Sequence, residues 1–132
     1  MADEYRTVDV WIGTFLTQDE LESYLEETFD EDDEDAPNSR FAADQGESFI
    51  DHDFMESSFH ETPSHLTHLL ANHSFAGSYS KVAITACEKS GVAMGNVVVL
   101  VFGAEIDSPR SVKDAAHSLT YLGRFDSDSV AE

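Results

Sequence analysis

The feature that most constrains the fold of this sequence is the run NVVVLVF at residues 96–102, in which every residue after the asparagine is apolar. A strand with one face in water alternates apolar and polar residues, whereas a strand covered on both faces is apolar throughout. The run therefore predicts a central, doubly covered β-strand. It is far too short to span a bilayer.

Two other segments alternate in polarity, as half-buried strands do. The first is TVDVWIGTF at residues 7–15. Val8, Val10 and Ile12 lie on one face of this strand, and Asp9, Trp11 and Gly13 lie on the other. The second is SLTYLGRF at residues 118–125, which predicts the last strand of the chain.

Capping signals predict two helices in the first half. Thr17 and Glu20 are three residues apart, as in a capping box that opens a helix. Its predicted inner face holds Leu21, Tyr24, Leu25 and Thr28. Because acidic side chains at a carboxyl end oppose the helix dipole, we expect this helix to fray into the acids that follow. A second, short helix at residues 40–45 is capped by Asn38 or Ser39.

The middle of the chain predicts one extended segment and two more helices. Residues 54–59 form a strand or an extended edge. Thr62 before Pro63 predicts a helix start, because proline is tolerated in a first turn. The buried face of this first helix holds Leu66, Leu69, Leu70 and His73. A second helix follows, and its buried face holds Tyr79, Val82, Ala83 and Ala86. Residues 104–117 predict a loop with at most one helical turn.

These elements predict a single α+β domain over residues 1–132. A roughly four-stranded, mainly antiparallel sheet packs against three or four helices in two layers. The length of 132 residues is sufficient for one hydrophobic core. We also expect an acidic flexible loop at about residues 29–38 and a short disordered tail at about residues 127–132.

Charge is distributed very unevenly. The net charge is −20, from 27 acidic and 7 basic residues. Residues 1–61 hold 20 of the acids but only two basic residues, Arg6 and Arg40. The segment EETFDEDDEDAP at residues 26–37 has eight acids and no Lys or Arg. Such a surface repels nucleic acid and anionic membranes, and it attracts cationic proteins and speeds their encounter.

The start of the chain and its cysteine content indicate a location. The first residues, MADEYRTVD, lack the basic and then apolar stretch of a secretory signal. A single cysteine, Cys87, excludes a disulfide framework and a cysteine-rich zinc site. Both observations favour the cytoplasm.

A histidine cluster is the main candidate for metal chemistry. Four histidines fall within fourteen residues, namely His60, His65, His68 and His73. There is no HExxH motif and no partner carboxylate at a recognisable spacing, so solvated surface histidines are the favoured interpretation. A histidine-based metalloenzyme is therefore the least favoured hypothesis for the function of this protein.

Other candidate groups give no support for catalysis. Consecutive residues in a strand point to opposite faces, so Asp51, His52 and Asp53 do not form a triad. Cys87, between alanine and polar neighbours in a predicted helix, is expected to be a buried inert thiol. The DEDDED segment lacks the alternating ligands and central glycine of an EF-hand. We predict no enzyme activity, no cofactor and no metal.

Trp11 allows two interpretations. Tryptophan is enriched at binding hot spots, but large aromatic side chains are usually mostly buried. We favour a core position and leave the exposed anchor open.

Several segments resemble the Immunity protein 22 family, small bacterial proteins encoded beside polymorphic toxins. They are VDVWIGTF with an acidic helix after it, SRFAADQGESFIDHDFMESSF, VVVLVF and LTYLGRFD, which together extend from about Val8 to Asp126. The most specific parts are Trp11-Ile12-Gly13, residues 51–59 and Leu122-Gly123-x-Phe125. The residues that the resemblance marks as structural hallmarks are Trp11, Gly13, Phe54 and Gly123.

The resemblance implies an α+β fold, no catalysis, and an antidote that neutralises a cognate toxin. Toxins of such systems include nucleases, whose active sites are basic because they hold phosphates. A nuclease is favoured over a membrane or cell-wall toxin, which would be met outside the cytoplasm. The alternative is a small acidic interaction or regulatory module for another basic protein.

The predicted partner-binding residues are acids of the first half. They are Asp30, Glu31, Asp32, Asp33, Glu34, Asp35, Asp51, Asp53 and Glu56.

Overall fold

The chain folds around one five-stranded antiparallel sheet, with strand order β2-β3-β1-β5-β4. The computed structural model describes residues 6–29, 31–33, 35–74, 76–92 and 94–127. The strands are β1 (Thr7–Phe15), β2 (Met55–Ser64), β3 (Gly95–Phe102), β4 (Val112–Lys113) and β5 (His117–Asp126). The predicted four-stranded sheet is therefore confirmed, with β4 as an additional two-residue edge strand.

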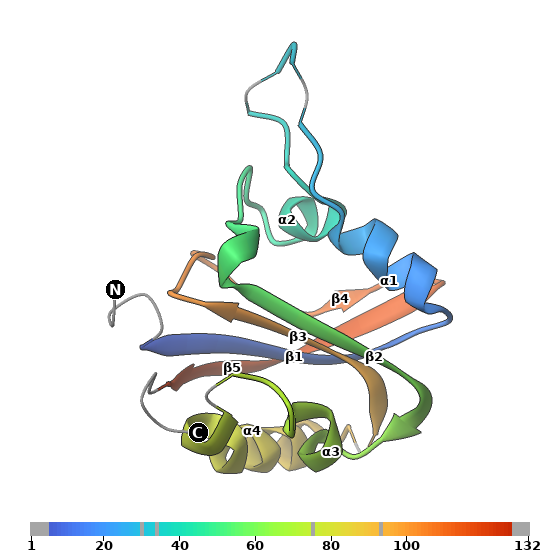
Figure 1. Ribbon diagram of the computed structural model, residues 1–132, viewed down its shortest axis with the longest axis vertical. Helices are drawn as coiled ribbons and strands as arrows, with labels where there is room; N and C mark the ends of the chain where they lie inside the picture. Colours follow the sequence, from blue (N-terminus) through green and yellow to red (C-terminus); the bar gives the residue numbers. More distant parts are fainter. Residues whose placement is uncertain (1–5, 30, 34, 75, 93, 128–132) are drawn as a thin grey trace.

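Four α-helices cover the two faces of this sheet. They are α1 (Gln18–Leu25), α2 (Arg40–Asp44), α3 (Leu66–Leu70) and α4 (Ala76–Ser90), and a 3-10 helix (His52–Phe54) precedes β2. Figure 1 shows α1 and α2 on one face and α3 and α4 on the other. The fold therefore has three layers, and the predicted two-layer packing is wrong. No helix in the described part of the chain is long and apolar enough to cross a membrane.

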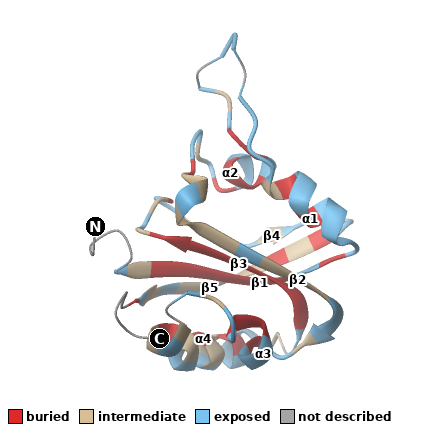
Figure 2. Cartoon of the chain, viewed as in Figure 1, coloured by how far each residue is buried: buried red, intermediate tan, exposed pale blue. Residues whose placement is uncertain are grey.

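Two hydrophobic cores result, one on each face of the sheet. β3 is buried at every position, as the unbroken apolar run predicts. Its residues Val98, Leu100 and Phe102 pack toward α3 and α4, whereas Val97, Val99 and Val101 pack toward α1 and α2. β1 alternates in the same way, because successive side chains of a strand point to opposite faces. Figure 2 shows the buried strands between exposed outer helix faces.

The predicted caps form at both helices of the first half. Thr17 Oγ1 accepts a hydrogen bond from Glu20 N at 3.1 Å and opens α1. Ser39 Oγ accepts one from Ala42 N at 2.9 Å and opens α2, which selects Ser39 over Asn38. α1 ends at Leu25, before the acidic run, and Thr28 lies beyond the helix and is exposed.

The helix predicted to start at Thr62 and Pro63 begins later. β2 continues through Ser64, and His65 is the N-cap of α3. Proline is compatible with this edge strand because its missing N–H can face away from the neighbouring strand. His73 then lies past the end of α3 rather than on its buried face.

Two smaller expectations are also wrong. Val82 is 51% exposed, because the buried stripe of α4 follows Tyr79, Ala83 and Cys87 at four-residue spacing. The segment 104–117, predicted as a loop, contains the two-residue strand β4.

Gly13 permits the close approach of β1 and β5. A Cβ atom at this position would lie 2.1 Å from Ser118 O and 2.8 Å from Leu119 Cδ2. Gly123 serves β5 differently: its φ of +140° accompanies the register shift opposite Val10 and Trp11. Both hallmark glycines therefore have a backbone reason to lack a side chain.

A buried carboxylate connects β1 to β5. Asp9 is fully buried, and its two oxygens accept hydrogen bonds from Arg124 Nε and Nη2, both at 3.0 Å. Tyr121 Oη donates a third bond at 2.6 Å. The bonds to Asp9 raise the pKa of Arg124, and burial together with the Asp9 bond raises the pKa of Tyr121. The buried carboxylate is thus compensated by a partly exposed guanidinium and a phenol.

We expect Arg124→Met to lower the free energy of unfolding by roughly 2–3 kcal/mol, because it leaves the buried Asp9 carboxylate without its charge partner, and Asp9→Asn to lower it by roughly 1–2 kcal/mol, because it weakens the bonds from Arg124 and Tyr121. The double variant should cost clearly less than the sum of the two, since it removes both charges. The measurement is urea unfolding at neutral pH. Glu88→Gln, at an exposed carboxylate, is the control and should change little; additive single effects would contradict the pairing.

Candidate functional site

The acidic segment forms a projecting loop, and we call residues 26–37 the acidic loop. It extends away from the body of the protein above α1 and α2 (Figure 1). Its described tip turns through a hydrogen bond from Ala36 N to Asp33 O at 3.2 Å, and Asp33 Oδ1 accepts one from Asp35 N at 3.0 Å. Of the predicted contact residues, Asp30 and Glu34 lie outside the described residues.

The base of the acidic loop is clamped to the domain. Thr28 N donates to Asn38 O at 2.7 Å, which closes the two ends of the loop on each other. The buried Asn38 side chain then donates to Ile50 O at 3.0 Å and accepts from Ile50 N at 3.2 Å. His52 Nε2 lies 2.7 Å from Leu25 O, the last residue of α1. These contacts fix where the loop leaves the fold.

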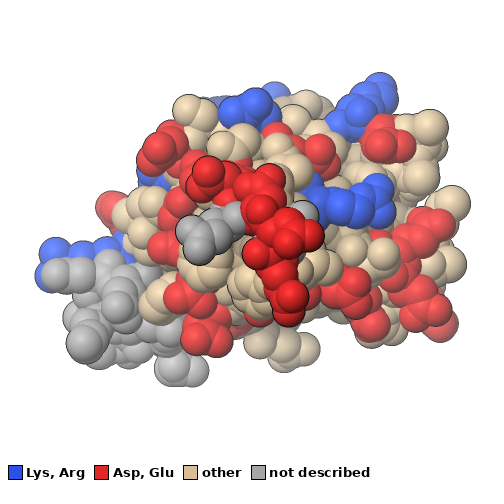
Figure 3. Space-filling view, turned by 90° about the horizontal axis from the view of Figure 1, so that it is seen from above, with Lys and Arg blue, Asp and Glu red and all other residues tan. Residues whose placement is uncertain are grey.

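The acidic side chains at the end of the molecule that carries the acidic loop are exposed, and few basic side chains balance their charge. Every described acid of α1 and of the acidic loop is exposed, namely Asp19, Glu20, Glu22, Glu26, Glu27, Glu31, Asp32, Asp33 and Asp35. Arg40 is the only Lys or Arg in the sequence between residues 7 and 80, and its guanidinium lies 5.4 Å from the centre of the Tyr24 ring. Figure 3 looks down on the loop and shows acidic side chains over much of this end, with a few basic ones among them.

Two more predicted contact residues lie at the same end. Asp51 is the N-cap of the 3-10 helix, and its Oδ1 accepts a hydrogen bond from Asp53 N at 3.0 Å. This helix lies on the α1 and α2 side of the sheet (Figure 1). Asp53 is exposed and Asp51 half-buried. The structure therefore brings both residues to the end of the molecule from which the acidic loop projects.

Glu56 is placed elsewhere, on the opposite face of the sheet. Its Oε1 accepts hydrogen bonds from Ser74 N at 3.0 Å and lies 2.9 Å from His73 Nδ1. The other nitrogen of that ring lies 3.0 Å from Ser58 Oγ. Burial acts to raise the pKa of Glu56, but the bonds from Ser74 and His73 outweigh it and leave the pKa below the ordinary value of 4.5.

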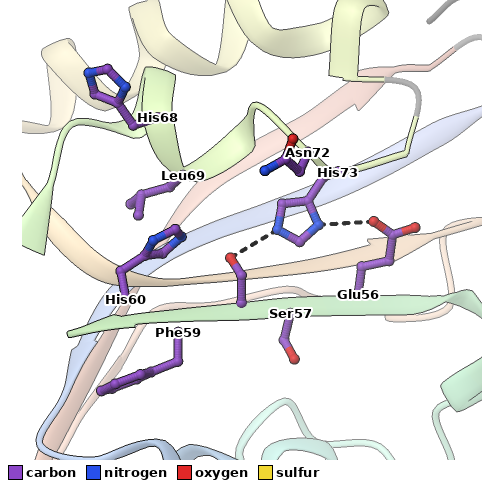
Figure 4. A pocket seen from close by; sticks show the side chains of 9 residues that line it. Glu56, Ser57, Phe59, His60, His68, Leu69, Asn72 and His73 are labelled. Carbon is purple, nitrogen blue, oxygen red and sulfur yellow. Dashed lines mark hydrogen bonds and ion pairs between the residues drawn. The ribbon is translucent and has the colours of Figure 1, made fainter. Parts of the chain in front are cut away.

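A hollow of about 420 Å³ surrounds this cluster. Figure 4 shows Glu56 and the His73 ring joined above β2, with His60 and His68 further along the same hollow and Ser57 and Phe59 pointing to the other face. His65 and His68 are exposed, as predicted. In the described part of the chain, no three His, Cys, Asp or Glu side chains are grouped so as to hold a metal ion.

A second groove lies between α1 and β2. It has a volume of about 320 Å³, and its apolar floor is formed by Leu21, Leu25 and Phe59. Glu22, Glu26 and Glu27 line it as well.

The family model of Immunity protein 22 matches residues 8–128. The chain belongs to the Immunity protein 22 family. Searches of curated proteins and of solved structures found no similar protein. The family implies a toxin-neutralising immunity protein with a cognate toxin as its partner, and immunity proteins are typically non-enzymatic inhibitors.

The hallmark tryptophan of this Immunity protein 22 member is a core residue. Trp11 is fully buried, and its ring lies 5.2 Å from Phe41 in an edge-to-face contact. Its Nε1 donates to Arg110 O at 2.9 Å, so the indole N–H is satisfied inside the protein. Phe54 packs half-buried against the core of α3 and α4. Cys87 is also buried, which raises its pKa, as expected for an inert thiol.

The sequence analysis considered Asn38 as a possible helix cap and His52 in a rejected triad, but it missed their role in anchoring the acidic loop. Asn38 lies just before α2 and His52 lies in the 3-10 helix before β2, and neither belongs to a recognisable motif. The available signal for Asn38 is its position between a proline and a helix N-cap, where a side-chain amide can replace a missing backbone partner.

We expect Glu56→Gln to lower the free energy of unfolding by roughly 1 kcal/mol at pH 7, because it weakens bonds to a carboxylate. Since the folded-state pKa of Glu56 is lowered, its contribution is present above about pH 4.5 and is lost as pH falls through the folded-state value. The difference between wild type and variant should therefore shrink in acid. Urea unfolding at pH 7 and at pH 3 measures it.

The matched control is Glu61→Gln, an exposed carboxylate on the same strand. Its difference from wild type should be small at both values of pH. A Glu56→Gln difference that stays constant across this range would contradict the assignment.

Proposed function

We propose that this immunity protein neutralises a basic toxin, with a nuclease as the favoured class, by stoichiometric binding in the cytoplasm. The contact surface is the acidic loop with the outer face of α1, Asp51 and Asp53. Of the predicted contacts in the acidic segment, Glu31, Asp32, Asp33 and Asp35 are described residues of this loop. Glu56 lies on the other face of the sheet and is not part of this surface.

The observation that supports this proposal is the large excess of acidic over basic side chains at one end of the fold. A loop without function needs no such concentration of acids, and solubility alone is served by dispersed charge. The loop also leaves the domain at a point held by Asn38 and His52, so its charge is presented from a defined place. An acidic projection of this kind attracts a cationic surface over several ångströms.

The chemistry of nucleases explains why a nuclease is favoured. A site that holds phosphates is lined with Lys and Arg, and it supplies the positive field that the acidic end complements. The acidic side chains can occupy such a groove in the place of nucleic acid, or bind beside it.

Co-expression tests the proposal directly. The toxin gene beside this one is induced in a sensitive host with and without the immunity gene, and growth is followed. Rescue of growth, together with a one-to-one complex of the purified proteins, is expected. A toxin that is not basic, or growth that is not restored, would overturn the proposal; an isolated operon of regulators would favour the alternative acidic module.

We expect neutralisation of the acidic loop to slow association with the toxin without changing dissociation. The variant carries Glu31→Gln, Asp32→Asn, Asp33→Asn and Asp35→Asn. Rim charges steer encounter, while buried anchors determine how long a complex lasts. At low ionic strength the association rate should fall by roughly tenfold, and its dependence on salt should flatten. Stopped-flow association across a salt series measures both.

The control removes the same number of charges elsewhere on the surface. It carries Glu61→Gln, Glu88→Gln, Asp114→Asn and Asp126→Asn, all at exposed positions. Both variants have the same net charge, so any difference between them reports the location of the acids. Equal salt slopes for the two variants would show that the acidic loop has no special role.

A further inference from the structure

We propose that the toxin docks on the outer edge of β2. An extended, cationic segment of the toxin pairs with this edge and becomes a sixth strand of the sheet. This inference rests on the proposed function and specifies how the partner is held after the acidic loop has attracted it. The partner's backbone pairs with residues 57–59, and its alternate side chains enter the two hollows on either side of β2.

The backbone of β2 has free groups at this edge. Gly103 N donates to Thr7 O at 3.1 Å, so Gly103 and every second residue before it direct their backbone groups to β1. Leu100 and Val98 therefore direct theirs to β2, where they pair with Glu56 and Ser58. The alternate β2 residues, Ser57 and Phe59, then point their N–H and C=O groups away from the sheet.

The sheet protects its two edges differently. At the other edge, β4 has only two residues and includes Lys113, and short, charged strands of this kind resist pairing. β2 has ten residues. Its second half has Pro63 and a register shift between Phe59 and Ser64, but residues 55–59 contain no proline, lysine or bulge. The one charge in that stretch, Glu56, is bound to His73 and Ser74.

Two hollows flank the unprotected stretch, one on each face of the sheet. Ser57, Ser58 and Phe59 line both the 420 Å³ hollow beside α3 and the 320 Å³ groove beside α1. Figure 4 shows the two directions: Glu56 and His60 point to one face, Ser57 and Phe59 to the other. An added strand has the same alternation, so successive side chains of the partner enter the two hollows in turn.

Charge identifies the occupant as a cationic segment. Glu22, Glu26 and Glu27 lie over the apolar floor of the groove beside α1, and Glu56 lies in the hollow on the opposite face. Among the described residues that line either space, none is Lys or Arg. Aliphatic stems with positive ends fit this combination. Glu26 and Glu27 also belong to the acidic loop, so the edge and the proposed surface are continuous.

A second copy of this chain is a poorer occupant. Each copy has a net charge of −20, and pairing β2 with β2 would bring the same acids together. A cationic partner is instead attracted by these acids.

The test compares Ser57→Pro with Ser57→Ala. Proline removes an N–H that faces solvent, which an edge strand tolerates, whereas alanine removes only the hydroxyl. The probe is the purified toxin domain encoded beside this gene. We expect Ser57→Ala to bind like the wild type and Ser57→Pro to bind at least about tenfold more weakly, mostly through faster dissociation. Both variants should unfold within a few degrees of the wild type.

Hydrogen exchange supplies a readout that does not depend on a variant. In the wild-type complex, the amides of Ser57 and Phe59 should become strongly protected. Unchanged exchange across residues 55–64, or equal toxin affinity of Ser57→Pro and Ser57→Ala, would overturn the docking strand while leaving the proposed function standing. If the wild type itself does not bind the toxin, the proposed function fails first. A free wild-type dimer that Ser57→Pro converts to monomer would show that a second copy is the occupant.

Discussion

The rest of the structure depends on the pairing of β1 along both of its edges. β1 joins β3 on one side and β5 on the other, although these strands come from the last third of the chain. Because β1 and β3 are also buried on both faces, helices must cover the sheet above and below. The same pairing leaves β2 and β4 as the edges. The pairing of β1 therefore determines the number of layers, the need for glycine at position 13 and the position of the free edge.

The compensated carboxylate of Asp9 adds specificity to that pairing. An apolar residue would suit the burial of this position, but it would not choose among registers of β5. Arg124 and Tyr121 meet the carboxylate only in the observed register, so a slip would leave a buried charge without partners.

The strands and caps could be predicted from the sequence because their signals are local. Alternation located β1 and β5, and an unbroken apolar run located β3. Capping residues located two helix starts, at Thr17 and at Asn38 or Ser39, and the structure selects Ser39 for the second. The errors arose where a local preference met a distant partner. Pro63 is acceptable both in a first helical turn and in an edge strand, and only the pairing with β3 decides between them. β4 has two residues and no periodicity of its own. The partner of Asp9 is more than a hundred residues away, beyond any local pattern.

The candidate site could be predicted only as a sum of charge, not as an arrangement. Composition identified the acidic half, but it did not show that Asp51 and Asp53 face the same end as the acidic loop while Glu56 faces the other side of the sheet. That separation follows from the alternation of β2 and from the 3-10 helix before it, whose start depends on the Asp51 cap. Asn38 and His52 were missed because their role is to hold a backbone in place, which leaves no trace in a charge count.

The acidic loop and the β2 edge suit two different ranges of interaction. At physiological salt, exposed charges act over roughly 8 Å, so a projecting loop can orient a basic partner before contact. Such charges are poor anchors, because water and ions compete for them in the complex. Backbone groups of an edge strand act only at hydrogen-bond distance, but their geometry admits few orientations. Because the α1 groove includes Glu26 and Glu27, a partner drawn to the loop arrives beside residues 57–59. In the proposed complex, attraction and docking follow each other without a change of fold, and selectivity among basic partners would rest on the side chains that fit the two hollows.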